Sequence, residues 1–249
     1  MWARAHRVDD GPPGWSRTVI TSTLCTVEGT GGLAEEHRRR WSAAHGGVPA
    51  SSPLVRAWLE GVRRCATPLV RAGVSPAALT LAGLALALLA LVPAATGGRW
   101  ALAVPLLLAA SAVLDGLDGA VAVIAGRTSR AGAVLDAGAD RVSDAAGLAV
   151  LWLLGAPAAP VLAAAGAGAL HEYLRARAQG EGMTGPGAVT VSERPTRVAV
   201  TAMFALGCGT HPAIAAGWAQ VGAWAAVATS LAGLVQLVLA LRRRLARGG

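Results

Sequence analysis

Long apolar segments constrain this chain more than any other feature of its sequence. No charged residue occurs from Ala77 to Gly97, a stretch long enough to cross a bilayer as a helix. Ser75 and Pro76 precede it as an N-cap and a proline at the first helical position. Five further apolar segments follow it, at about residues 100–115, 132–154, 157–177, 194–206 and 216–241. The chain is therefore predicted to be an all-α membrane protein with six transmembrane helices.

The arginines predict how these helices are oriented. Arginines lie before the first segment, between the second and third, between the fourth and fifth, and in the tail, whereas the alternate links are nearly free of charge. Because positive charge collects on the cytoplasmic side, both termini are expected in the cytoplasm and the protein in the plasma membrane. The acidic residues of the second and third segments then face the cytoplasm.

Two segments precede the spanning region. Residues 1–50 are polar and without period, and are expected to form a poorly ordered cytosolic extension. In residues 51–72, Trp58, Leu59 and Val62 fall on one helical face and Arg63 and Arg64 on the other, which predicts an amphipathic helix lying in the membrane interface. An ordinary packed surface helix is the alternative. Residues 73–245 form the predicted transmembrane domain.

The composition narrows the class of partner. The chain is 54% hydrophobic and 14% charged, with a mean hydropathy of +0.51. Its net charge is +8, but the basic residues, all arginine, punctuate apolar segments, so the expected partner is the lipid bilayer and not nucleic acid. Cys25, Cys65 and Cys208 have no spacing that indicates a disulfide framework or a zinc site.

Four aspartates interrupt the apolar sequence in pairs. Asp115 and Asp118 are three residues apart, and Asp136 and Asp140 are four apart, so each pair shares one face of a helix. One such charge in a spanning helix costs roughly 2.5–3.5 kcal/mol, and four cost on the order of 10–14 kcal/mol before compensation. Hard divalent cations bound through oxygen would offset this cost. The alternatives are helix-end salt bridges with nearby arginines, and an ion-conducting path.

The spacing of these residues carries a resemblance. Asp115-x2-Asp118-Gly119-x2-Ala122-x9-Gly132-x3-Asp136-x3-Asp140 resembles the signature of the CDP-alcohol phosphotransferase family. Within that family, Gly73-Val74-Ser75-Pro76, Arg175-Ala176-Arg177 and Glu193-Arg194-Pro195 are similar to phosphatidylinositol phosphate synthases of actinobacteria.

The resemblance implies a fold, an activity and a site. It implies six transmembrane helices in a homodimer, two Mg²⁺ or Mn²⁺ ions, and transfer of a phosphatidyl group from CDP-diacylglycerol to an alcohol, such as inositol phosphate or glycerol phosphate, with release of CMP. Asp115, Asp118, Asp136 and Asp140 would be metal ligands, with Asp140 also the catalytic base. Contacts to the donor or to the acceptor's phosphate are implied for Thr80, Gly119, Ser129, Arg130, Arg175, Arg177 and Arg194.

One position departs from the family signature. Val123 stands where the family has an arginine that helps to bind the nucleotide donor, and Arg127 or Arg130 could supply that charge from the following loop. An inactive paralogue and an ion-coupled transporter are the alternative functions.

Overall fold

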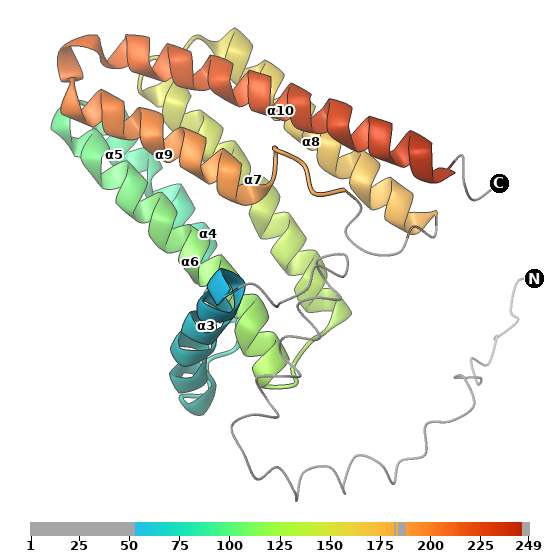
Figure 1. Ribbon diagram of the computed structural model, residues 1–249. Coiled ribbons are helices and arrows are strands. Elements are labelled where there is room, and N and C mark those ends of the chain that lie inside the picture. Colours follow the sequence, from blue (N-terminus) through green and yellow to red (C-terminus); the bar gives the residue numbers. More distant parts are fainter. Residues whose placement is uncertain (1–52, 182, 184–187, 246–249) are drawn as a thin grey trace, which may run out of the picture.

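The computed structural model describes residues 53–181, 183 and 188–245, and within these residues every regular element is helical. Seven of the helices run side by side as an elongated bundle (Figure 1). They are α4 (Pro76–Leu89), α5 (Leu91–Thr96), α6 (Ala103–Ile124), α7 (Arg130–Leu153), α8 (Ala158–Gly180), α9 (Arg194–Thr210) and α10 (Ala215–Leu245). Two short 3-10 helices, η1 (Gly98–Leu102) and η2 (Pro212–Ile214), connect neighbouring helices. The predicted all-α class is confirmed.

The predicted helices match the observed ones except at a break in the first and at the ends of the second and fifth, since α6 continues to Ile124. The first segment, predicted as a single helix from Ala77 to Gly97, is divided at Ala90 into α4 and α5. Pro93 explains the break, since it has no N–H to donate and its ring crowds the carbonyl one turn earlier. The fifth helix continues beyond the predicted end at Leu206 to Thr210.

Three helical segments are long and apolar enough to cross a membrane: Pro76–Thr96, Gly98–Ile124 and Pro212–Arg243. The other three predicted spans form helices but differ in composition or length. Helix α7 carries Asp136, Asp140 and Asp144, the last two turns of α8 carry charged residues, and α9 has 17 residues against the roughly 20 that a span needs. Their crossing of the membrane stays a prediction.

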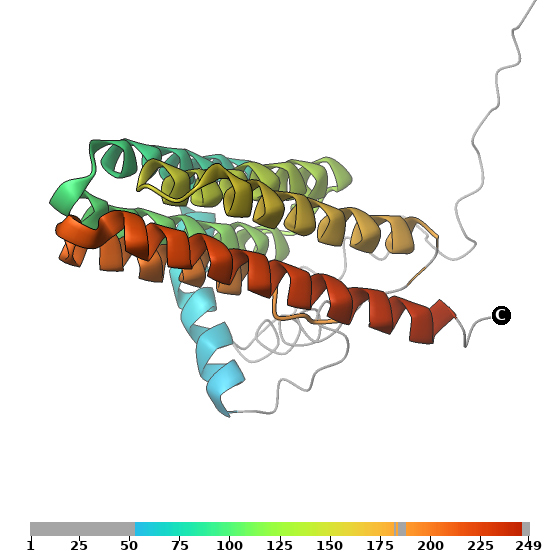
Figure 2. The ribbon, with the colours of Figure 1, turned by 90° about the horizontal axis from the view of Figure 1, so that it is seen from above.

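Helix α3 (Pro53–Arg71) projects from the bundle at a steep angle (Figure 2). Its Ala66 is fully buried in a small apolar cluster with Leu79 of α4 and Val121 of α6, and Val62 packs against this cluster. This half of α3 therefore rests on protein, as the alternative of a packed surface helix requires. The predicted position of the helix in the membrane interface is not tested by these contacts. The predicted extension, residues 1–50, lies outside the described residues.

Small residues allow the helices of the bundle to approach closely. A Cβ at Gly207 of α9 would lie 2.6 Å from the ring of Trp218 on α10, and one at Gly222 of α10 would lie 2.7 Å from Phe204 on α9. Both glycines are therefore required by the packing of α9 against α10. The main apolar core, which includes Phe204, Val150 and Leu151, lies at the end of the bundle away from the acidic residues.

Candidate active site

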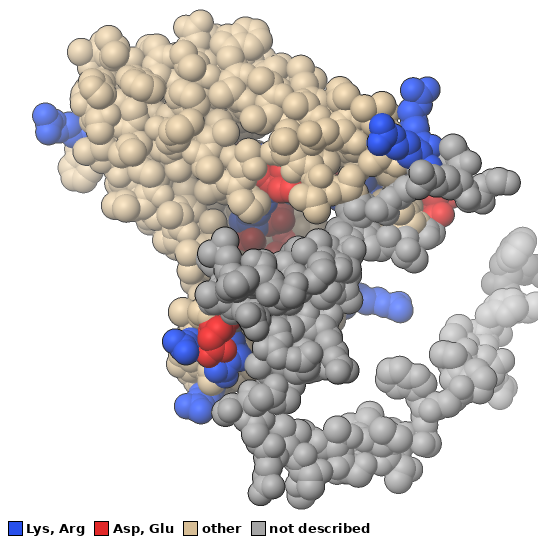
Figure 3. Space-filling model, viewed as in Figure 1, with Lys and Arg blue, Asp and Glu red and all other residues tan. Residues whose placement is uncertain are grey.

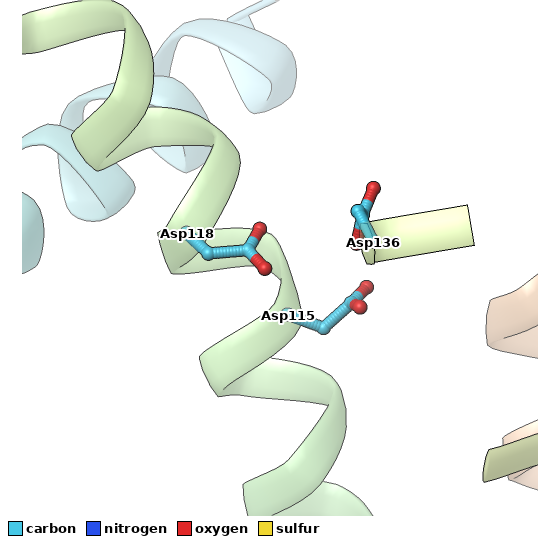
Figure 4. A group of neighbouring side chains, drawn as sticks. All are labelled: Asp115, Asp118 and Asp136. Atoms are coloured by element: carbon cyan, nitrogen blue, oxygen red, sulfur yellow. The ribbon is translucent and has the colours of Figure 1, made fainter. Parts of the chain in front are cut away.

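Three of the four predicted acids converge between α6 and α7. Carboxylate oxygens of Asp115, Asp118 and Asp136, one from each residue, all lie within 4.8 Å of one another. Figure 4 shows the side chains of Asp115 and Asp118 extending from α6 toward that of Asp136 on α7. Asp118 is buried, and the other two are half-buried. The spacing in the sequence placed each pair on one face, and the packing of both helices against α4 lets the two faces approach each other.

Thr80 supports this group from a third helix. Its hydroxyl, on α4, donates a hydrogen bond to Oδ2 of Asp118, and both residues are buried. A buried carboxylate with a fixed hydrogen-bond donor keeps one orientation, so its other oxygen is presented to the acidic group. Thr80 is thus placed to orient a ligand.

Arg194 links the fourth acid to the other three. Its guanidinium, in the first turn of α9, forms ion pairs with both Asp115 and Asp140. Asp140 lies one turn after Asp136 on α7 but is outside the group of three. Its roles as ligand and as base stay predictions.

Three predicted donor contacts lie on α6 or at the start of α7. Ser129 is the N-cap of α7, and its hydroxyl accepts a hydrogen bond of 3.0 Å from the backbone N–H of Gly132. Arg130 follows it and is exposed. At Gly119 no atom lies within 4 Å of the position that a Cβ would take, so the surface of α6 is open there. This open, positively charged end of the helix pair could receive a diphosphate.

A second group of charges, which we call the arginine–carboxylate network, lies one helical turn beyond Asp140. It contains Arg141, Asp144, Glu172, Arg175, Glu193 and Arg197. Arg175 pairs with Glu193 at 2.6 Å, Arg141 with Asp144 at 3.1 Å, and Arg197 with Asp144 at 3.3 Å. On the face shown in Figure 3, the bundle is nearly free of charge, and acidic and basic atoms gather in a hollow beneath it.

Glu193 is held in its charged form within this network. Burial alone would raise the pKa of Glu193, but hydrogen bonds from Arg175 and from the N–H and hydroxyl of Thr190 outweigh burial and keep the pKa below its usual value. Thr190 in turn contacts Nε2 of the fully buried His171 at 3.1 Å.

The structure brings Thr80, the four acids and Arg194 together, whereas Arg177 lies apart from them. Arg177, the last predicted arginine of α8, is 66% exposed and pairs with Glu181 at 2.6 Å. It contacts neither the acids nor the network in the described part of the chain. Arg175, two residues earlier on α8, points into the network.

The segment between α8 and α9 is anchored by the last helix. A Cβ at Gly233 of α10 would lie 2.3 Å from the Cβ of Ser192, so only glycine allows this approach. Gln236, one turn later, accepts a hydrogen bond of 2.8 Å from the N–H of Val191. The carbonyl of Ser192 accepts a hydrogen bond of 2.6 Å from Arg197. These contacts fix the segment that leads into Arg194.

Three residues at the centre of the network were not singled out in the sequence as site residues. They are Glu172, Glu193 and Arg197, which lie on or before two helices that the acidic motif does not include. The available signal was charge within apolar helices: Glu172 and Arg197 interrupt otherwise apolar faces as the aspartates do.

The comparisons with known proteins agree with this fold. The family model for CDP-alcohol phosphatidyltransferases matches residues 74–235. A bundle of membrane-compatible helices around converging acids is thus an integral membrane enzyme that transfers a substituted phosphate group. The chain belongs to the CDP-alcohol phosphatidyltransferase family.

Two curated relatives and two solved structures are similar to the chain. Phosphatidylinositol phosphate synthase of Mycolicibacterium smegmatis is 34% identical over 195 residues, covering 75% of this chain and 86% of the relative. Archaetidylinositol phosphate synthase of Aeropyrum pernix is 36% identical over 101 residues, covering 41% of this chain and 52% of that relative.

The solved structures are of the Mycobacterium tuberculosis phosphatidylinositol phosphate synthase. The one with CDP-DAG bound has a TM-score of 0.59 and 26% identity, over 72% of this chain and 92% of that chain. The one in complex with manganese and citrate has a TM-score of 0.60 and 26% identity, over 72% and 88% of the two chains.

The donor set fits a divalent metal. Three carboxylates within reach of one another offer hard oxygen ligands, which Mg²⁺ and Mn²⁺ prefer. Among the described residues, the cation paired with this group is Arg194, which contacts Asp115 and Asp140, so four carboxylates share one positive charge there. A divalent cation would supply the missing charge.

Proposed function

We propose that this protein transfers the phosphatidyl group of CDP-diacylglycerol to the hydroxyl of an alcohol and releases CMP. The observation that carries the proposal is the convergence of Asp115, Asp118 and Asp136 within 4.8 Å, on the two helices that bear the family's acidic motif. The relative with CDP-DAG bound has the same fold and supports the choice of donor.

Asp115, Asp118, Asp136 and Asp140 would hold two Mg²⁺ or Mn²⁺ ions, which supply charge neutralisation for a diphosphate. Thr80 keeps the carboxylate of Asp118 in one orientation. Arg194, paired with Asp115 and Asp140, moderates the repulsion between acids of the two helices. Gly119, Ser129 and Arg130 form the open end of the helix pair where the nucleotide part of the donor would bind.

The reaction exchanges one P–O bond for another. The acceptor's hydroxyl oxygen bonds to the β-phosphorus of the donor, the bond from that phosphorus to the CMP oxygen breaks, and the hydroxyl proton passes to Asp140. Asp140 lies between the acids and the network, where an alcohol beside Arg175 and Arg194 would present its hydroxyl. The printed names of the relatives make inositol phosphate the first acceptor to test.

We also propose the membrane topology, the cellular location and the oligomeric state of the enzyme. Six spans, both termini in the cytoplasm and a cytoplasmic active site in the plasma membrane are supported by the observed helix order and the arginine-bearing links. A homodimer is supported by the small residues of α8, such as Ala163 and Gly166, which are exposed in the single chain. Residues 73–245 would form the catalytic domain, with α3 in the membrane interface.

Release of CMP tests the activity. Purified protein is incubated with Mn²⁺ and CDP-diacylglycerol and with inositol phosphate, glycerol phosphate, serine or inositol in turn. We expect CMP with at least one acceptor and none after chelation of the metal. Absence of CMP with every acceptor, at protein concentrations where the mycobacterial relative turns over, would contradict the proposal and favour an inactive paralogue or a transporter.

A further inference from the structure

His171 is a fully buried polar side chain to which the proposed reaction gives no role. It lies on α8, and its Nε2 is 3.1 Å from the hydroxyl oxygen of Thr190, in the segment between α8 and α9. Thr190 is also buried, with 6% of its surface exposed. The two side chains therefore form a polar contact inside the protein, 19 residues apart in the sequence.

The direction of the hydrogen bonds in this contact can be assigned. The hydroxyl of Thr190 donates to Oε1 of Glu193 at 3.2 Å, and the backbone N–H of Thr190 donates to the same oxygen at 3.0 Å. Because a hydroxyl has one proton to donate, Thr190 must accept from His171, whose Nε2 therefore carries a proton. Hydrogen bonds thus run in one direction, from His171 through Thr190 to the carboxylate of Glu193.

That carboxylate holds the guanidinium of Arg175. Its two oxygens accept hydrogen bonds of 2.6 and 3.1 Å from Nη2 and Nη1, and the carbonyl of Ala188 accepts a third, of 3.4 Å, from Nη2. Nε of Arg175 is buried without a hydrogen-bond partner in the described residues, as is Nε of Arg194. Two oriented guanidinium groups with donors to spare suit a phosphate, whose oxygens accept several charge-assisted hydrogen bonds.

The other ring nitrogen of His171 faces the second carboxylate beside Arg175. Nδ1 is 3.4 Å from Oε1 of Glu172, and that oxygen is 3.9 Å from Nη1 of Arg175. The buried imidazole thus lies between the two acids that contact Arg175. Its position bears on both sides of the same guanidinium.

We propose that the buried His171–Thr190 pair positions Arg175 for the phosphate of the acceptor. Neither residue of the pair touches a substrate, and both act through the carboxylate of Glu193. The inference rests on the proposed phosphatidyl transfer to a phosphorylated alcohol, and it assigns the residues that set the affinity for that alcohol.

Thr190→Val is the main test, because it removes the hydroxyl and keeps the shape of the side chain. CMP release is measured with Mn²⁺, CDP-diacylglycerol and inositol phosphate. We expect KM for inositol phosphate to rise about tenfold, while kcat and KM for CDP-diacylglycerol stay as in wild type. Thr190→Ser, which restores a hydroxyl, should restore the wild-type KM. An unchanged KM for inositol phosphate in Thr190→Val would overturn the inference.

Thr210→Val is the matched control. The hydroxyl of Thr210 also contacts a histidine, Nδ1 of His211, at 2.9 Å, but at the opposite end of α9 from Arg194. This variant should keep the wild-type KM for both substrates. An equal rise of KM in both threonine variants would assign the effect to general destabilisation and contradict the inference.

His171 tests whether the pair acts as one unit. His171→Gln places an N–H at a similar reach and should keep most of the affinity for inositol phosphate, whereas His171→Leu should raise KM as Thr190→Val does. The double variant, His171→Leu with Thr190→Val, should raise KM little more than either change alone. Effects that multiply in the double variant would show two independent roles and contradict the inference.

Binding measurements separate this inference from the proposed function. Calorimetric titration of wild type and Thr190→Val with inositol phosphate, without donor, should show the same tenfold difference in affinity. Equal affinity would overturn the role of the pair even if CMP release had failed for another reason. Absence of CMP with every acceptor would contradict the phosphatidyl transfer itself, and a wild type that uses only uncharged alcohols would contradict this inference and leave the transfer standing.

Discussion

The acidic site and the arginine–carboxylate network differ in how their charges are balanced, although they adjoin on α7. Four aspartates of the acidic site face one paired guanidinium, that of Arg194, in the described residues. In the network, three arginines face three carboxylates. The first group is incomplete without a cation, and the second is complete as it stands. The comparison teaches that charge balance, more than the presence of charged residues, distinguishes a site that must bind an ion from one that shapes a pocket.

The largest effect should follow from removing a carboxylate of the acidic site. Asp136→Asn takes away one of the three converging ligands, so Mn²⁺ affinity should fall more than about 100-fold, beyond the loss typical of outer-sphere changes, and CMP release should disappear. Calorimetric titration with Mn²⁺ measures the affinity, with Glu181→Gln as the control. Unchanged Mn²⁺ affinity would remove the distinction between the two groups.

Asp140→Asn sharpens the comparison, because Asp140 lies between the two groups. If its main role is that of a base, turnover should fall roughly 10²- to 10⁴-fold. Mn²⁺ affinity should fall much less, since Asp140 is outside the group of three converging oxygens. Single-turnover CMP release and Mn²⁺ titration are measured on one preparation. A loss of affinity as large as that of Asp136→Asn would make Asp140 principally a ligand.

Thr80→Val tests how far the acidic site depends on support from α4. The substitution keeps the shape of the side chain and removes the hydrogen bond to Asp118, so Mn²⁺ affinity should fall by about 10- to 100-fold. Wild-type affinity in this variant would show that Asp118 is oriented without Thr80.

The smallest effect should come from Glu193→Gln in the balanced network. Because the folded-state pKa of Glu193 is below its usual value, its ion pair stabilises the protein above the unfolded-state pKa, and this stability is lost as the pH falls through the folded-state pKa. The variant should unfold at a lower temperature than wild type at pH 7, and the difference should shrink below about pH 4. Unfolding temperatures in detergent across pH measure this. A difference that persists in acid would assign the effect to packing.

Most of the fold and half of the site could be predicted from the sequence. Apolar runs, Ser75-Pro76 and the arginine-bearing links predicted most helix ends to within a few residues, because these signals are local, but α6 continues to Ile124, beyond the predicted end near residue 115. The spacing of the aspartates predicted that α6 and α7 present acids to each other. The contacts of Arg194 could not be predicted in the same way, since Asp115 is 79 residues away and the ion pair depends on how α9 packs.

The ion pairs of the arginine–carboxylate network could not be predicted from the sequence either. Glu172 and Arg197 are recognisable as charges within apolar helices, but which arginine each carboxylate meets depends on helix rotation. No spacing in the sequence encodes rotation between α8 and α9, which are joined by a segment that includes residues outside the described part of the chain. The rotation of α8 relative to α9 is known only from the structure.

Gly233 has a consequence for how this enzyme can be recombined with its relatives. The absence of a side chain there lets Ser192 rest on the last helix, and the next turn secures Val191 through Gln236. In a chimaera whose α10 lacks this glycine and this glutamine, the segment that leads into α9 would be displaced, and Arg194 would move with it. The C-terminal helix thus fixes the position of Arg194, although the proposed catalytic side chains all lie on other helices.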